Sequence, residues 1–105
     1  MPTGRLGAVD LSANTNTQVY VVPDGKIASL NVNICNRSGN PATVRLAVSQ
    51  TTSPSGAEWI EYDTVLPAKT PLERTGLVLA AGQRVIAFSN IAAVSVQAFG
   101  FEESA

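Results

Sequence analysis

The chain has 105 residues and a mass of 10.9 kDa, which is the size of one domain and leaves no room for a second. Only 14% of its residues are charged, and a formal net charge of −1 without a basic cluster argues against nucleic-acid or membrane partners. Because the chain has no histidine and a single cysteine, Cys35, catalytic triads, histidine-containing metal sites and internal disulfides are excluded.

The first segment, residues 1–17, is poor in large apolar side chains. It lacks the apolar stretch of a signal peptide, so we expect synthesis in a cytoplasm. No later apolar run approaches the ~20 residues of a membrane-spanning helix. Residues 1–17 are either an extended arm that orders against a neighbouring protein or a terminus that frays. Arg5 and Leu6 are the candidate interaction residues of such an arm.

Two segments alternate apolar and polar residues at period two, the pattern of a half-buried β-strand. In residues 28–36 the apolar positions are Ala28, Leu30, Val32 and Ile34. In residues 43–49 they are Val44, Leu46 and Val48. The linker between them is rich in Asn, Ser, Gly and Pro, so we expect an antiparallel hairpin that forms the centre of the core.

Shorter strand candidates are separated by turns that contain Gly, Pro or Asn. They lie at residues 6–11, 18–22, 58–66, 72–79, 84–89 and 94–101. No segment shows helical spacing with a cap and a stop. About eight short strands predict one all-β domain over residues 1–105, an antiparallel β-sandwich or a small jelly-roll-like barrel.

Acid–base chemistry would have to use carboxylates such as Glu61 and Asp63, which are two positions apart on a strand and therefore expected on one face. Alternate charged positions on a strand usually form a solvated face, so we favour a protein that is not an enzyme. Cys35 has no histidine to activate its thiol, and we expect it to be a packing residue. No spacing resembles a metal-binding or phosphate-binding loop, and we expect no cofactor and no metal.

Three residues in the second half of the chain are further candidates for interaction. Trp59, expected on the face opposite Ile60 and Tyr62, would anchor a sugar or a protein neighbour if it is half-exposed. Glu73 and Arg74 are neighbouring opposite charges suited to a docking surface. Lysines that would protect sheet edges are few, so we expect a homo-oligomer, with a trimer as the favoured state.

Five segments together resemble small accessory structural proteins of tailed bacteriophages, and the similarity covers residues 19–103. They are NICNR at 33–37, EYD at 61–63, LERTGLVL at 72–79, AGQRV at 81–85 and FGFEE at 99–103. The resemblance implies assembly in the virion rather than catalysis, with major capsid or tail proteins as partners. We expect a capsid decoration or cement protein that binds and braces other virion subunits. The alternative is a tail, baseplate or fibre module that joins tail proteins or contacts the host surface, and a sugar-binding sandwich or a cytoplasmic enzyme are the more distant alternatives.

Overall fold

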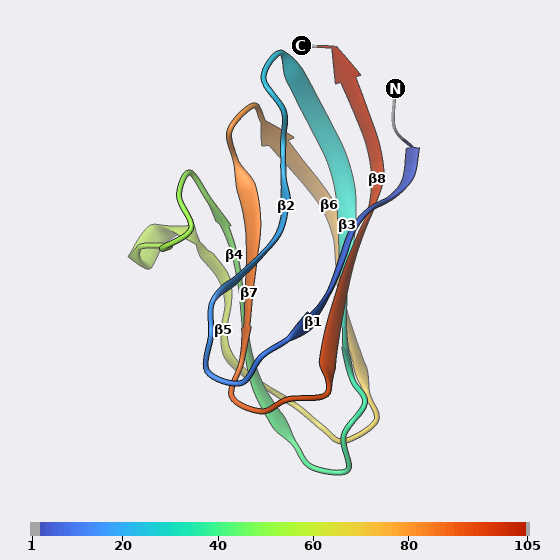
Figure 1. The fold of residues 1–105 in the computed structure, drawn as a ribbon, viewed down its shortest axis with the longest axis vertical. Coiled ribbons are helices and arrows are strands. Elements are labelled where there is room, and N and C mark those ends of the chain that lie inside the picture. Colours follow the sequence, from blue (N-terminus) through green and yellow to red (C-terminus); the bar gives the residue numbers. More distant parts are fainter. Residues whose placement is uncertain (1–2, 105) are drawn as a thin grey trace.

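Alternating apolar and polar residues form eight β-strands in the computed structural model, which describes residues 3–104 (Figure 1). The strands are β1 (Thr3–Leu11), β2 (Thr17–Val21), β3 (Lys26–Asn36), β4 (Ala42–Ser49), β5 (Trp59–Leu66), β6 (Pro71–Ala80), β7 (Arg84–Ser89) and β8 (Val94–Ser104). A short 3-10 helix, η1 (Gly56–Glu58), precedes β5.

The strands form two four-stranded antiparallel sheets, in the orders β1-β8-β3-β6 and β2-β7-β4-β5. Figure 1 shows the two sheets as the two layers of a sandwich. The β-sandwich predicted from the alternation is therefore confirmed, and the chain has about as many strands as expected.

The core lies between the inner faces of the two sheets. Leu30, Val32 and Leu46 are fully buried, as predicted for the strands at the centre of the core. The predicted face holds to the end of β4, where Val48 is half-buried, packs against the core and pairs with the core residue Val85. Ala47 pairs with Ile86 of β7 on the outer face, and both are nevertheless 0% exposed.

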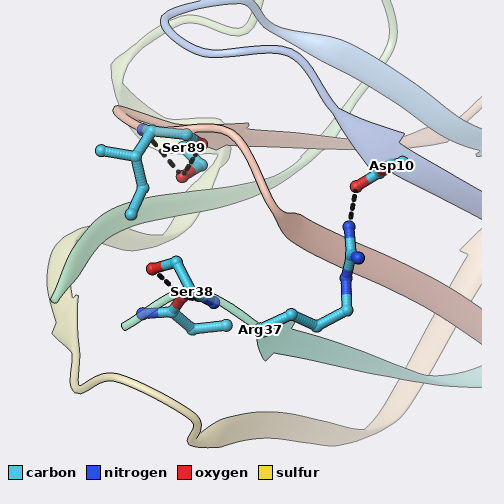
Figure 2. A network of polar contacts seen from close by, with 6 residues as sticks. Asp10, Arg37, Ser38 and Ser89 are labelled. Atoms are coloured by element: carbon cyan, nitrogen blue, oxygen red, sulfur yellow. Dashed lines mark hydrogen bonds and ion pairs between the residues drawn. The ribbon is translucent and has the colours of Figure 1, made fainter. Parts of the chain in front are cut away.

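The predicted hairpin between β3 and β4 is wrong, since the two strands belong to different sheets. β3 pairs with β6 and β8, whereas β4 pairs with β5 and β7. The linker between them crosses one end of the sandwich and is held there by Asn36, which is 0% exposed. Close to it, Arg37 donates to Asp10 of β1 at 2.6 Å (Figure 2). Alternation predicts a strand but does not identify its neighbours.

The segment considered as an arm forms an edge strand of the domain. β1 pairs with β8 from Thr3 to Leu11, Leu11 is buried, and Leu6 packs against the core. Residues 3–11 are therefore not an extended arm but a strand of the sheet that contains β8. Residues 1–2 of the expected arm lie outside the described residues. Gly7 of this segment has a packing reason, because a side chain there would collide with the Val19 carbonyl.

Every edge strand contains a break in its register. The pairings of β1 with β8, β2 with β7, β6 with β3 and β5 with β4 all shift, while the central pairings β3–β8 and β4–β7 run without a shift. Bulges bend and twist an edge and so discourage pairing with a foreign strand. The edges are thus blunted by bulges rather than by lysines, since neither Lys26 nor Lys69 lies on an edge strand.

Candidate functional site

The outer face of the β2-β7-β4-β5 sheet carries a group of aromatic side chains around one arginine. We call Arg45, Trp59, Tyr62, Asp63 and Phe88 the aromatic cluster. Arg45 lies on β4, Phe88 is directly opposite it on β7, and the other three residues come from β5. Three strands of one sheet therefore hold the cluster.

Arg45 is at the centre of the cluster. Its Nε donates a hydrogen bond to Oδ1 of Asp63 at 2.6 Å, and this bond raises the pKa of Arg45 above its ordinary value. Its guanidinium carbon lies 4.3 Å from the centroid of Tyr62, 4.7 Å from that of Phe88 and 6.0 Å from that of Trp59. These distances are in the range of cation–π contacts, so the charged group is fixed on the surface.

A bulge in β5 creates this arrangement. Val44 pairs with Thr64 and Leu46 with Glu61, so Tyr62 and Asp63 together occupy the place opposite Arg45. Asp63 takes a φ of 52°, in the left-handed region that aspartate tolerates better than most residues. The strict alternation of faces along β5 is therefore interrupted.

The same bulge separates the two carboxylates that were expected on one face. Glu61 accepts a hydrogen bond from the Thr64 hydroxyl at 2.8 Å and forms an ion pair with Arg74 Nη1 at 3.0 Å. Arg74 lies on β6 of the facing sheet, whereas Asp63 binds Arg45 on the outer face. Glu61 and Asp63 thus point in different directions, and the shared face expected from their spacing is wrong.

Trp59 is half-buried, as a surface anchor should be, but it lies beside Tyr62 rather than on the opposite face. The two rings meet edge to face, with centroids 5.4 Å apart and planes at 70°. Tyr62 is 56% exposed. A surface hollow of about 520 Å³ is lined by Gly56, Trp59 and Tyr62.

The loop before β5 is held by Glu58, which positions the start of the strand. Its carboxylate accepts hydrogen bonds from Ser49 Oγ, Gln50 N and Ser55 N at 2.9, 3.2 and 2.9 Å. These bonds, the one from the Ser55 backbone first, lower the pKa of Glu58. Trp59 follows directly, so the hollow is bordered by an anchored loop.

The structure does not bring the other predicted interaction residues to this cluster. Arg5 is exposed on β1, opposite Phe99, and Leu6 packs against the core. Glu73 is exposed on β6, and Arg74 links β6 to β5 through Glu61. These residues lie at two different edges of one sheet.

Sequence reasoning missed Arg45 and Phe88 and placed Tyr62 on the wrong side of β5. Alternation in β4 could have marked Arg45 as an outward-facing residue, but the strands beside it are not encoded locally. The position of Tyr62 depends on a bulge for which the sequence gives no plain signal.

Three other features bear on function: possible metal ligands, the cysteine thiol and apolar helices. Residues 3–104 contain no group of three or more His, Cys, Asp or Glu side chains that could hold a metal ion. Cys35 is half-buried on β3. No helix among the same residues is long and apolar enough to cross a membrane.

Comparison with protein-family models, with curated proteins and with solved structures gives no significant match for this chain. The fold and the geometry of the aromatic cluster define it as a β-sandwich that carries, on one outer face, aromatic rings around a half-buried arginine.

Proposed function

We propose that this protein is a non-enzymatic structural module of a phage virion, a capsid decoration protein that binds and braces other virion subunits. The observation that carries its binding role is the aromatic cluster on the outer face of the β2-β7-β4-β5 sheet. The virion and capsid parts of the proposal draw on the sequence resemblance.

The composition of the cluster suits a protein interface. Trp, Tyr and Arg are the residues most enriched among those that dominate binding energy. Arg45 is already fixed by Asp63 and two rings, so a partner would lose little side-chain entropy in binding it. Only Nε of Arg45 donates to another residue within 3–104. The two Nη groups are left to donate to a carboxylate or a carbonyl group of a partner.

Partners of this domain would bind its faces rather than its edges. All four edge strands contain a register shift, which interrupts the regular row of N–H and C=O groups that strand addition requires. Binding through side chains that project from a sheet face needs no such row.

The test is attachment of the protein to particles. Trp59→Ala and Tyr62→Ala should each reduce occupancy on intact particles, with affinity about 30-fold lower if these residues contribute the ~2 kcal/mol of a binding hot spot. Gln97→Ala, an exposed residue of the other sheet, is the matched control and should bind normally. Unchanged occupancy of both cluster variants would rule out this surface as the attachment site.

The same particles separate the head from the tail. A decoration protein should raise the resistance of particles to heat or osmotic shock. Particles without the protein that keep full stability but lose adsorption to the host would instead favour a tail, baseplate or fibre module.

The hollow beside Trp59 and Tyr62 favours one further candidate, a sugar-binding function. Aromatic faces next to polar groups are the usual surfaces on which pyranose rings stack. Quenching or shift of the fluorescence of Trp59, the only tryptophan of the chain, on titration with soluble glycans would support this candidate over a protein partner if Tyr62→Ala, which removes the other ring of the hollow, abolishes the change. We expect no glycan hydrolysis by the purified protein.

A further inference from the structure

The outer face of the other sheet, β1-β8-β3-β6, has an apolar area at one end. Ile27 of β3, Val78 of β6 and Phe101 of β8 are 36%, 64% and 40% exposed. We call these three residues the Phe101 patch. They account for three of the five large apolar residues that are exposed among residues 3–104.

The patch is a hollow with a small residue at its floor. Val78 and Phe101 both pair with Ser29 of β3, one from each side. The short side chain of Ser29 leaves space between the two larger ones, and the resulting hollow has a volume of about 160 Å³. It is lined by Ile27, Ala28, Ser29, Val78, Phe101 and Glu103. A projecting apolar side chain would fit between Val78 and Phe101.

The backbones of β8 and β3 approach each other closely next to the hollow, at Gly100 and Ser29. A side chain on Gly100 would come within 2.1 Å of the Ser29 carbonyl oxygen. The close approach fixes the backbone on both sides of the hollow, so the patch is part of the rigid sheet rather than of a loop.

Two charges of opposite sign lie on either side of the patch along the strand direction. Glu103 pairs with Ile27 at one end, and Arg5 pairs with Phe99 on the other side of Phe101. Four residues of a strand separate Phe99 from Glu103, which corresponds to about 13 Å. Neither Arg5 nor Glu103 makes an ion pair within residues 3–104.

This order of charges is complementary to itself. When two copies meet face to face about a two-fold axis that runs across the strands, the strand direction of one copy is reversed over the other. Arg5 of each copy then lies over Glu103 of its mate, and the two Phe101 patches cover each other. A parallel superposition would instead place like charges together.

We propose that the Phe101 patch is a self-association surface, through which two copies of this chain pack face to face with reciprocal Arg5–Glu103 ion pairs. This inference stands independently of the role of the aromatic cluster, which lies on the other sheet. The proposed assembly is a two-fold dimer, because the surface is complementary to itself, whereas the sequence favours a trimer. The apolar area is small for a permanent interface, so we expect a dissociation constant in the micromolar range.

Sedimentation of the purified protein between about 1 and 100 µM tests the association. The wild type should convert from monomer to dimer within this range. Val78→Thr should weaken dimerisation about tenfold, whereas Val65→Thr, an equally exposed valine of the other sheet, should leave it unchanged. A wild type that stays monomeric at 100 µM, or that sediments as a trimer, would overturn the proposal.

Charge reversal tests the orientation. Arg5→Glu and Glu103→Arg should each weaken the dimer about tenfold, because each places like charges opposite one another. The double variant exchanges the two charges and should dimerise within about threefold of the wild type. A double variant as weak as the single ones would show that the two residues do not meet. Thermal unfolding of each variant verifies that the sandwich is intact, since both side chains lie on the surface.

Discussion

Replacement of Asn36 by alanine should lower the free energy of unfolding far more than replacement of a polar residue on the surface would. The Asn36 side chain is fully buried where the β3–β4 linker crosses the end of the sandwich. Its Nδ2 lies 2.8, 3.1 and 3.2 Å from the carbonyl oxygens of Asn40, Leu66 and Pro67. Its Oδ1 accepts hydrogen bonds from the backbone N–H and the hydroxyl of Ser38. One amide therefore joins the β3–β4 linker to the β5–β6 linker.

The magnitude follows from the groups that the substitution leaves without partners. A buried hydrogen bond contributes about 1 kcal/mol net, and a buried group left unpaired costs about 1 to 3 kcal/mol. Some of these carbonyl groups lie near the end of the sandwich and can regain water, so we expect a loss of about 3 to 4 kcal/mol. A chain of this length has an unfolding entropy near 0.2 kcal/mol/K, which converts the loss into a fall in Tm of about 15 °C.

Thermal and urea unfolding of Asn36→Ala measure this loss, with Asn33→Ala as the control. Asn33 lies three positions earlier on the same strand, half-buried on the outer face, and its side chain makes no hydrogen bond within residues 3–104. We expect a shift below about 0.5 kcal/mol for the control. Similar shifts for the two variants would refute the view that the Asn36 amide holds the two linkers together.

Three further predictions concern the core, one buried polar pair and one ion pair. Leu46→Ala should cost about 2 to 5 kcal/mol in urea unfolding, because Leu46 is 0% exposed between the sheets. Burial, followed by the hydrogen bond that Tyr20 donates to Glu102, raises the pKa of Tyr20, so this contribution to stability is complete below about pH 10 and is lost at higher pH. Tyr20→Phe should therefore be less stable than the wild type at pH 7 but lose less stability between about pH 10 and 12, and parallel curves would contradict this. Arg74→Ala should cost at most about 1 kcal/mol, and the difference should shrink at high salt, because its ion pair with Glu61 is partly exposed.

The sequence was a good guide to the strands and to the centre of the core. Period-two alternation identified the buried face of β3, where Leu30 and Val32 are almost fully enclosed. Burial of one face is a local property, because each residue along a strand points away from its neighbour. The pattern therefore predicts a strand and its inner face without knowledge of the rest of the chain.

The pairing of strands and the sites that depend on it could not be predicted in this way. The β3–β4 linker has the turn residues of a hairpin, yet it crosses the sandwich and is held there by residues distant in the sequence. Asn36 donates to Leu66 and Pro67, about 30 residues away, and Arg37 donates to Asp10. The aromatic cluster likewise needs Phe88 beside Arg45, a contact between residues 43 positions apart. A bulge at Asp63 moves Tyr62 to the side of Trp59, and alternation assumes that no such bulge exists.

The bulged edges and the two outer faces together constrain how this domain can assemble. The aromatic cluster and the Phe101 patch lie on the outer faces of different sheets, with the whole core between them. Occupation of one face therefore leaves the other accessible. A dimer joined through the Phe101 patches would present two aromatic clusters on its two outward sides. One scaffold could bind both clusters only if its binding sites were placed so that both clusters contact it at the same time. Otherwise the dimer would link two separate partners, which is the geometry of a brace between neighbouring subunits.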